Sequence, residues 1–490
     1  MNNKSINQKS ILKKTLRTLI FTVFLFSFLA ASSQEKEWTL EDCINYALDN
    51  NIDIKKQLLI VETQKDQLLQ SKLGMLPSLN AGATHGYNWG NTVDRYTNSF
   101  ATTRVQSNNF YVGTQFNLFQ GLQQINTVNK TKLDWLATQY DLDLMMDNIS
   151  IAVAGYYLDI LYNQELLNVA RGQIAVTNQQ VNRMEKMVLA GTLARGDLLN
   201  IEAQAATEEL LVIEAENRLA ISYLTLQQLI DLPVTGGFRI ETPALKPIDA
   251  PQVTFNANDV YQVALGKRPE IKSAEYRVQS AEKGVSFARG YLSPTLSFSG
   301  SWATGYSGAS QQENGQTIIK TLPIGYLQSN PAEIVLSDYE TSAGYTVIPF
   351  GDQLNDNQNK SLSFSLQIPI FNGWQVRTAI SQAKIRKEEA DLTLQKTKLD
   401  LDKTIQLAYA DAVAALKNYN ASEKKLQAQQ EAFKYSEQKM GVGLVTAVEY
   451  NQTKKDLTKA ESDLLQAKYR FIYTTTILDF YMGNPLTLDK

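Results

Sequence analysis

Four stretches of the chain alternate between apolar residues and small polar ones. A period of two over about ten residues is typical of a β-strand with one apolar face. Serine, glycine, asparagine and threonine occupy most of the intervening positions. The apolar positions are Leu79, Ala81, Ala83, Tyr87 and Trp89, then Phe110, Val112, Thr114, Phe116 and Leu118, then Leu296, Phe298, Trp302 and Tyr306, and finally Leu362, Phe364, Leu366, Ile368 and Ile370. This is the pattern of a transmembrane β-barrel, although a soluble β-sandwich with an apolar core has it too.

Aromatic residues and long connections favour the barrel. Tyr87, Trp89, Trp302 and Tyr306 are candidates for the aromatic girdle that such barrels place at the membrane–water interface. His85 lies on the apolar register beside Tyr87, so we expect it at the interface rather than in a reactive site. The two connections between paired strands are polar and span about 20 and about 54 residues, as extracellular loops often do.

A different pattern predicts two very long helices. The chain contains no proline from Ser78 to Leu232, which includes residues 122–190, and none from Ile370 to Asn484 in the second half. Apolar residues recur with spacings of 4, 3, 4 and 7, which average the 3.5-residue period of a coiled coil. The two seams are Ile149, Val153, Tyr156, Ile160 and Leu167, and Leu401, Ile405, Ala408, Ala412 and Tyr419. Each long helix ends near a glycine, and return helices are predicted at residues 197–230 and 449–482.

The chain is an internal duplication. Thr39 and Asn256 each begin a short helix as N-caps, with an aspartate three residues later. Asp42 aligns with Asp259 at an offset of 217, and Phe119-Gln120-Gly121 aligns with Phe371-Asn372-Gly373 at an offset of 252. The alignment offset increases by 35 residues from the first pair to the second, which places one insertion between Pro294 and Phe371. The predicted organisation is a first repeat at 34–254 and a second at 255–490, with an enlarged strand–strand connection at 307–360.

Four strands cannot close a barrel alone. An open sheet in lipid would leave the backbone groups of its edge strands unpaired, at several kcal/mol each. Three chains that share one barrel would supply 12 strands, which lies within the observed range. The predicted fold is therefore mixed and mainly α-helical, with long coiled-coil helices and four strands per chain in a homotrimer.

The N-terminus predicts a secretory signal peptide at residues 1–33. Five basic residues precede an apolar run at 19–29, and small residues follow at 30–33. Eleven apolar residues are too few for a membrane-spanning helix, which needs about 20. Cys43 lies well past this run, so we do not expect it to carry a lipid anchor.

Composition excludes several classes of function. Fifty acidic residues outnumber 47 basic ones, and loss of the signal peptide makes the chain more negative, so we expect no nucleic-acid partner. One cysteine and one histidine exclude a disulfide framework, a multi-cysteine zinc site and a histidine-rich metal site. The sequence contains no GxSxG, HExxH or P-loop motif, so we expect neither an enzyme nor a cofactor.

At this point the sequence resembles the TolC-like outer membrane efflux protein family. The resemblance covers essentially the whole mature chain. It is carried by the duplicated segments at residues 47–54 and 264–271, the Phe-x-Gly turns ending at Gly121 and Gly373, and the helix-turn-helix tips at 190–197 and 442–449. It implies a homotrimer with a 12-stranded outer-membrane barrel, an α-barrel tunnel in the periplasm and an equatorial mixed domain. It also implies docking to a periplasmic adaptor (membrane fusion protein) and an inner-membrane transporter of RND or ABC type, which would supply the energy for a passive conduit.

The resemblance assigns roles to the tips. Glu449 matches the first of two acids that narrow the periplasmic mouth in the family, whereas Gln452 occupies the second position and departs from a two-ring acidic gate. Asp197 is the counterpart of Glu449 in the first repeat. Either acid could instead stabilise the first turn of its helix by binding free amides and complementing the helix dipole. Gly191 and Gly443 are expected to terminate helices, and the family uses them with the neighbouring Leu193, Leu444 and Val445 as adaptor contacts.

Two functions therefore compete. The first is a trimeric export channel in the outer membrane of a Gram-negative-type bacterium, surrounded by outer-membrane lipid and carrying drugs, small toxic compounds or secreted polypeptides. The second is a trimeric coiled-coil stalk with a β head that serves a structural or adhesive role at the surface. The lipid-facing alternation favours the channel, since an adhesin needs no such face.

Overall fold

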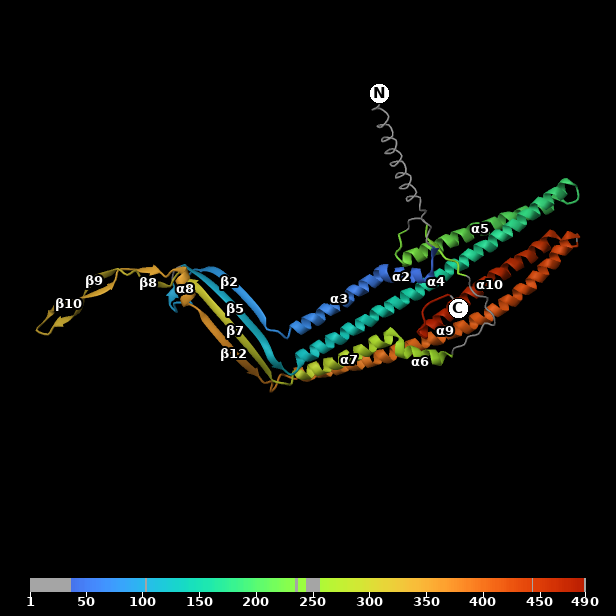
Figure 1. Ribbon diagram of the computed structural model, residues 1–490. Coiled ribbons are helices and arrows are strands. Elements are labelled where there is room, and N and C mark those ends of the chain that lie inside the picture. Colours follow the sequence, from blue (N-terminus) through green and yellow to red (C-terminus); the bar gives the residue numbers. More distant parts are fainter. Residues whose placement is uncertain (1–36, 102–103, 234–236, 244–255, 443, 489–490) are drawn as a thin grey trace, which may run out of the picture. The chain divides into compact units, whose positions relative to one another are not determined.

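The structure is a computed structural model, and it describes residues 37–488 except 102–103, 234–236, 244–255 and 443 (Figure 1). The predicted signal peptide and Gly443 lie outside the described residues. The chain forms two compact units. The first, the helical unit, comprises residues up to 62, 137–275 and from 393 onward, and the second, the strand unit, comprises residues 63–136 and 276–392.

Both halves of the sequence contain the same elements in the same order. The first half contains α2 (Leu40–Asn50), α3 (Ile52–Leu73), β2 (Ser78–Asn88), β5 (Val105–Gln120), α4 (Gln123–Leu189) and α5 (Arg195–Leu229). The second contains α6 (Ala257–Lys267), α7 (Pro269–Gly290), β7 (Thr295–Ser307), β12 (Asn359–Gln367), α9 (Gln375–Gly441) and α10 (Ala447–Tyr481). Corresponding helices have identical lengths of 11, 22, 67 and 35 residues. Each half contributes to both compact units, so the sequence repeats and the compact units divide the chain differently.

The helix starts differ in how they are capped. At α2 the hydroxyl of Thr39 accepts from the backbone N–H of Asp42, and the Asp42 carboxylate accepts from the N–H of Thr39, which completes a capping box. At α6 the side chain of Asn256 accepts from the N–H of Asn258, one residue earlier than the box predicted with Asp259. The side-chain oxygen of asparagine is one bond further from the backbone than that of threonine, and both oxygens accept from an unpaired backbone N–H of the first helical turn.

Four strands form one antiparallel sheet in the strand unit. The order is β12-β7-β5-β2, so the central pair β5·β7 joins the two repeats. Strands β2 and β12 are the edges of this sheet. A bulge in β5 between Asn117 and Phe119 places Phe119, rather than the predicted Leu118, opposite Leu296.

Two predicted strand ends are wrong by a few residues. Strand β12 ends at Gln367, so Ile368 and Ile370 follow it rather than continue it. Pro369 has no backbone N–H to offer to a ladder, which ends the pairing there. Trp89 likewise follows the last residue of β2, and the next residue, Gly90, turns the chain with a φ of 100°.

The enlarged connection at 307–360 is folded, and it is less polar than predicted. It contains the paired strands β9 (Thr317–Leu327) and β10 (Asn330–Ser342), the short pair β8 (Gln311–Glu313) and β11 (Tyr345–Val347), and the helix α8 (Phe350–Asp356). The β9·β10 hairpin exposes Ile319, Ile324 and Tyr326. The alternation of apolar and polar residues is interrupted by Pro323 and by a register shift near Leu336. The hairpin therefore lacks the regular period of two that predicts a strand. The shorter connection at 89–104 contains the pair β3 (Thr92–Val93) and β4 (Phe100–Ala101).

The helical unit is built around the predicted seams. Val153, Ile160 and Leu167 are buried on α4, and Val153 and Ile160 belong to a core formed with α2, α5 and α10. On α9, Leu401 and Ile405 pack against residues of α6 and α7. Tyr156 is the exception, because 40% of its side chain is exposed and it borders a groove instead of the core. The predicted heptad register is therefore correct for most of the seam but not at this position.

A short parallel pair, β1 (Glu37–Trp38) with β6 (Arg239–Ile240), packs on this core. The hydroxyl of Tyr157 donates to the carbonyl oxygens of Trp38 and Glu241, at 3.2 and 2.7 Å. Cys43 is fully buried in the same core, where its role is packing. Burial raises the pKa of Tyr157 well above its ordinary range.

Candidate channel wall and helical tips

The sheet has two chemically distinct faces. Residues paired across antiparallel strands share a face, and on one face serine pairs with serine between β7 and β12. The three pairs are Ser297 with Ser365, Ser299 with Ser363, and Ser301 with Ser361. The hydroxyls of Ser301 and Ser361 lie 2.8 Å apart. We call this the serine face; its small hydroxyl side chains suit contact with water.

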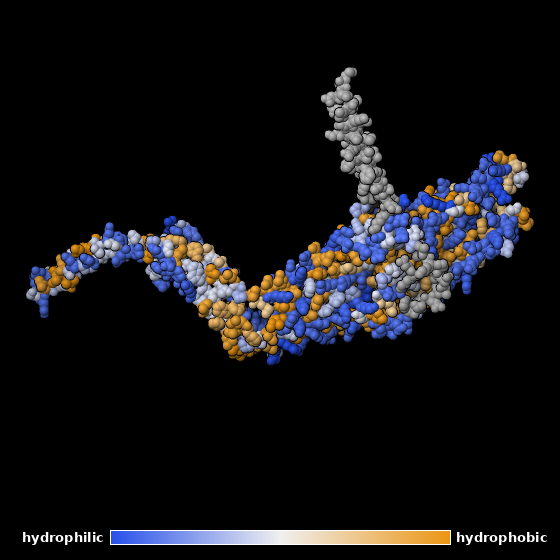
Figure 2. All heavy atoms as spheres, in the orientation of Figure 1, coloured by the Kyte–Doolittle hydropathy of each residue, from blue (hydrophilic) through white to orange (hydrophobic). Residues whose placement is uncertain are grey.

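The opposite face is apolar. It includes a row of three phenylalanines, one on each of three neighbouring strands, that sequence reasoning did not single out as a row. The ring centroids of Phe116 and Phe298 are 5.5 Å apart, and those of Phe298 and Phe364 are 5.1 Å apart. Figure 2 shows hydrophobic side chains gathered where the strands approach the helices. Alternation of this kind on every strand is the arrangement of a barrel wall between lipid and a polar lumen.

The predicted interface aromatics lie on this apolar face or just beyond it. Tyr87 contacts both His85 and Trp89, at centroid distances of 5.1 and 6.1 Å, and the guanidinium of Arg104 lies 5.0 Å from its ring centre. Tyr306 is paired with Asn108, and Asn108 with His85, so these residues form one row across the sheet.

Trp302 belongs to a different row. It is paired with Val112, which is paired with Ala81, four residues along β7 from Tyr306. Phe350 of α8 joins the aromatic group, with its ring 5.4 Å from that of Tyr306. Sequence reasoning missed Phe350 because it lies in the insertion, outside any alternating stretch. The role of these residues at a membrane interface stays a prediction.

The first tip joins α4 to α5. The N–H of Thr192 donates to Met187 O and that of Gly191 donates to Val188 O, while Gly191 has a φ of 73°. These two bonds form a Schellman motif, so Gly191 ends the helix as a glycine in the left-handed region. Leu193 is partly buried, because it packs against the cluster of Met184 and Ile201, and Met440 packs against the same cluster. Met440 comes from α9, so the two hairpin tips contact each other within this chain.

The second tip joins α9 to α10. Leu444 is 74% exposed, whereas Val445 is half-buried. The N–H of Leu444 donates to Lys439 O, which closes the end of α9 as Thr192 closes α4. Leu189 on the first tip and Val442 on the second are also largely exposed. The two tips together present apolar side chains to their surroundings.

Glu449 begins the return helix of the second tip. The N-cap of α10 is Thr446, whose hydroxyl accepts from the N–H of Glu449 at 3.2 Å. The capping bond is therefore made by the threonine, and the carboxylate of Glu449 is exposed. Asp197 occupies the first turn of α5, where the N-cap is Ala194, which makes no side-chain capping bond.

Gln452 is hydrogen-bonded to a second acid of α10. Its side-chain amide donates to the carboxylate of Asp456 at 3.1 Å. Asp456 follows Glu449 by seven residues, which is two helical turns, so both carboxylates lie on one side of α10. The i, i+7 spacing of Glu449 and Asp456 is visible in the sequence, but the family pattern points to position 452 and not to Asp456.

A buried ion pair joins the two hairpins in the helical unit. Lys454 Nζ on α10 lies 3.1 Å from Glu208 Oε1 on α5, and the exposed fractions of the two side chains are 4% and 8%. Lys454 also donates to Gln173 O and to the hydroxyl of Thr177 on α4. Burial lowers the pKa of Lys454, and the attraction of Glu208 opposes that shift. Sequence patterns could not predict this pair, because its members are far apart in the chain.

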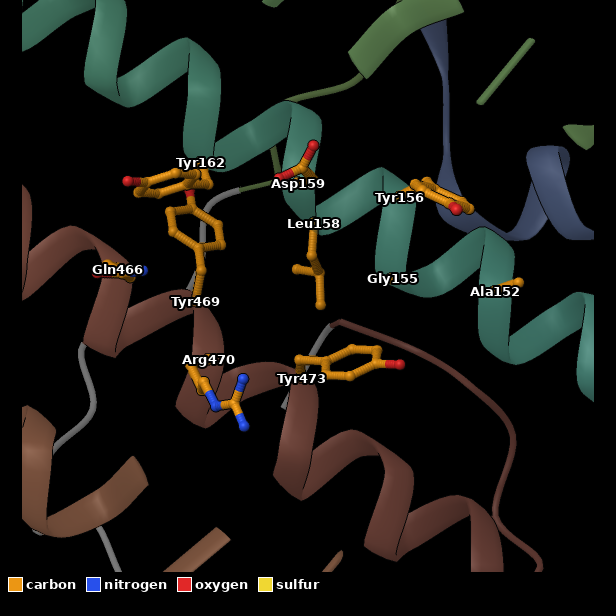
Figure 3. Close-up of a pocket in the computed structure, with 10 residues that line it drawn as sticks. All are labelled: Ala152, Gly155, Tyr156, Leu158, Asp159, Tyr162, Gln466, Tyr469, Arg470 and Tyr473. Atoms are coloured by element: carbon orange, nitrogen blue, oxygen red, sulfur yellow. The ribbon is translucent and has the colours of Figure 1, made fainter. Parts of the chain in front are cut away.

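A groove of about 670 Å³ lies between α4 and α10 in the same unit (Figure 3). Its lining residues are Ala152, Gly155, Tyr156, Leu158, Asp159, Tyr162, Gln466, Tyr469, Arg470 and Tyr473. Both charged groups in the lining have partners in the chain. The carboxylate of Asp159 accepts from Asn163 at 3.1 Å, and Arg470 contacts Asp411 at 3.4 Å. The groove is therefore a gap between packed helices whose charges are already paired.

Comparison with known proteins identifies the family. A family model described as "Outer membrane efflux protein" matches residues 43–231 and 260–484. The outer membrane efflux protein BepC of Brucella suis biovar 1 (strain 1330) is 20% identical over 479 residues, which cover 97% of this chain and 92% of BepC. The outer membrane protein TolC of Escherichia coli (strain K12) is 22% identical over 482 residues, which cover 96% of this chain and 87% of TolC.

A solved structure shows the same fold. The outer membrane protein VceC from Vibrio cholerae matches with a TM-score of 0.69 at 16% sequence identity, over 91% of this chain and 97% of VceC. The family model matches once in each half of the sequence and accounts for most of the chain. This chain belongs to the outer membrane efflux protein family.

Proposed function

We propose that the protein is the passive outer-membrane channel of a tripartite export system. Family membership supports this function. Among the relatives are a pyoverdine export outer membrane protein and an alkaline protease secretion protein of Pseudomonas aeruginosa, so the family includes exporters of small molecules and of polypeptides. Cargo of either class, including drugs and small toxic compounds, is compatible with a channel that performs no chemistry on it.

One observation carries the proposal. The four-stranded sheet separates a serine face from an apolar face, and within the described residues β2 and β12 are its edge strands. Exposed edges in lipid are costly, because each unpaired backbone group there loses several kcal/mol. Pairing β12 of one chain with β2 of the next in a homotrimer closes 12 strands, with the serine face lining the lumen.

The helices extend the conduit into the periplasm. In this proposal three copies of α4, α5, α9 and α10 enclose an α-barrel tunnel. The exposed apolar residues of the tips, including Leu189 and Leu444, support docking to a periplasmic adaptor. An inner-membrane transporter of RND or ABC type supplies the energy. Leu193 supports the fold of the tip more than the contact surface, because it packs against Met184 and Ile201.

The periplasmic mouth is narrowed by acids of α10. Glu449 is exposed at the start of the helix, and Asp456 follows on the same side, held by Gln452. Three copies of these carboxylates around the axis would form two negative rings, which favour cations and repel anions.

Reconstitution into planar lipid bilayers tests the function. A channel produces discrete single-channel currents at low protein concentration, whereas a surface stalk produces none. Heat-denatured protein at the same concentration is the control for unspecific leakage. An intact bilayer in the presence of correctly assembled protein would favour the structural or adhesive alternative.

A further inference from the structure

The outer end of the sheet, away from the long helices, contains a network of side-chain hydrogen bonds. The connection between β2 and β5 folds back there as a turn from Asp94 to Ser99. The N–H of Asp94 donates to Ser99 O at 3.0 Å, and that of Asn98 donates to Asp94 O at 2.8 Å. Asp94 is only 6% exposed, although it lies in a surface connection. Burial of a carboxylate is costly unless hydrogen bonds compensate for the lost hydration.

Asp94 ties the turn to the end of β7. Its Oδ2 accepts from the hydroxyl of Ser307 at 2.6 Å, and Ser307 is fully buried. Its Oδ1 accepts from the backbone N–H of Tyr96 and Thr97 and from the Thr97 hydroxyl, at 3.0, 2.8 and 3.1 Å. Burial raises the pKa of Asp94, but these hydrogen bonds together outweigh it and hold the pKa below its ordinary value. The carboxylate is therefore held charged as a fixed anchor.

The turn lies over the serine face, not over the apolar face. Tyr96 donates its hydroxyl to the side chain of Asn109, which is paired with Gly305 across β5 and β7. A Cβ atom at Gly305 would collide with the Tyr96 hydroxyl. Gly305 follows Ser297, Ser299 and Ser301 by even steps along β7, so it points to the same side as the serines. Glycine at position 305 thus makes room for the Tyr96 ring.

The other connection occupies the free edge of β7 instead. The amide of Gln353 on α8 accepts from the N–H of Ser307 and donates to its carbonyl oxygen, at 2.9 and 3.0 Å. Asn357 donates to Gly305 O at 2.8 Å. These side chains replace a neighbouring strand where β12 has not yet begun, and Phe350 covers Tyr306 on the apolar side. Ser307 is therefore held from two directions, which leaves the turn little freedom.

We propose that the turn Asp94–Ser99 is a built-in constriction at the outer mouth of the channel, and that Asp94 and Tyr96 set the size of cargo that can leave. This inference rests on the proposed function, because the serine face lines a lumen only if the sheet closes into a barrel. Three copies of Tyr96 then project into that lumen from the wall. A fixed turn acts as a size filter, which is separate from any gate at the helical tips.

Thiol labelling from outside the cell tests the constriction. Ser299→Cys places a thiol on the serine face six residues below Gly305, about 20 Å further along the strand. The natural Cys43 is fully buried, so the parent protein serves as the unlabelled background. The probes are a small methanethiosulfonate and a maleimide attached to a bulky poly(ethylene glycol). With Ser299→Cys alone, we expect the small probe to react and the bulky probe to react slowly.

Asp94→Ala and Tyr96→Ala are then added singly. Loss of the anchor or of the ring should raise the labelling rate with the bulky probe by about tenfold or more, because the local structure opens when its buried hydrogen bonds are lost. Asp338→Ala is the matched control. This variant also removes one carboxylate from a connection between strands, because Asp338 accepts a hydrogen bond from Thr321 in the β9·β10 hairpin. It should leave the labelling rates of both probes unchanged.

The outcomes separate the two proposals. An unchanged bulky-probe rate in both variants, or rapid reaction before either is introduced, overturns the constriction while the channel stands. If even the small probe fails to reach Ser299→Cys in assembled protein, the serine face does not line a lumen and both proposals fail. The small-probe rate also reports folding of each variant. If Asp94→Ala does not assemble, Ser307→Ala removes only one bond of the anchor and should give a smaller increase in the bulky-probe rate; no increase would again overturn the constriction.

Discussion

Single glycines shape the turns that lead from the sheet into the long helices. Gly121 and Leu122 have φ values of 58° and 59°, and Gly373 and Trp374 have 59° and 69°. Each repeat thus makes the turn with two successive residues in the left-handed region, the first of them glycine. The duplicated Phe-x-Gly motif was visible in the sequence, and this backbone conformation is its physical reason.

The two glycines differ in their surroundings, which gives a matched prediction. A Cβ atom at Gly121 would collide with the carbonyl oxygen of Gly290, whereas Gly373 has open space around it. Gly373→Ala should cost about 1–2 kcal/mol from the left-handed backbone alone. Gly121→Ala should cost more, since the backbone at Gly290 must also move. Thermal unfolding of the two purified variants measures the order, and equal midpoints would contradict the collision.

The acids at the tips give a second prediction at this scale. Glu449→Gln should lower cation preference and weaken block by Mg²⁺, because three exposed carboxylates on the pore axis act on a passing ion. The N-cap bond should survive, since Thr446 makes it. Asp197→Asn should change neither property if Asp197 lies away from the axis, because charges separated by more than about 8 Å are largely screened at physiological salt. Single-channel selectivity measures both, and an effect of Asp197→Asn alone would exchange the roles of the two hairpins.

At the scale of elements, the contact between the hairpins contains a buried ion pair, whereas the sequence predicted only an apolar seam. The ion pair of Lys454 with Glu208 lies among buried residues of α4, α5 and α10. Heptad spacing correctly predicted Val153, Ile160 and Ile405 as buried, because it depends only on residues within one helix. It could not predict a lysine in the interior, since the partner that makes its burial tolerable comes from another helix.

Removal of one partner should therefore be worse than removal of both. Lys454→Met leaves Glu208 buried without its cation and should destabilise the protein by about 3–5 kcal/mol. Lys454→Met combined with Glu208→Leu should recover most of that loss, because no charge is left buried. Thermal unfolding midpoints of the single and double variants measure the difference. A double variant less stable than Lys454→Met would mean that Glu208 contributes through Thr177 rather than through the lysine.

The strands show where local reasoning ends. The period of two in the sequence correctly predicted which residues lie on each face of the sheet, in β5 as far as Asn117, because the alternation follows from strand geometry alone. The bulge that exchanges Leu118 for Phe119 depends on the partner strand, and so does the row of Phe116, Phe298 and Phe364. The insertion was predicted by the change of offset, but its fold, with the hairpin and α8, was not predicted, and neither was the anchor at Asp94. These features depend on contacts across the sheet, which a single stretch of sequence does not encode.

For the whole molecule, the edges of the sheet predict the oligomer. Purified protein in detergent should be a trimer, because further copies of the chain can pair β2 and β12, the edge strands of the sheet in the described part of one chain. Multi-angle light scattering, corrected for bound detergent, should give three times the mass of one mature chain. A monodisperse monomer would show that the edges are covered by some other means and would remove the basis for a shared barrel.

The equal lengths of corresponding helices carry a consequence for how such a chain can evolve. Helices of 67 and 35 residues occur in both repeats, without a single residue gained or lost between them. A deletion of one residue in α4 would rotate everything beyond it by about 100°, and so would turn its buried side chains toward solvent. An inherited deletion is therefore tolerable only with a compensating change in the same helix. The connection at 307–360 obeys no such rule and has accepted an insertion of 35 residues relative to the first half. Length is thus a selected trait in the helices, while the outer connections are free to diverge.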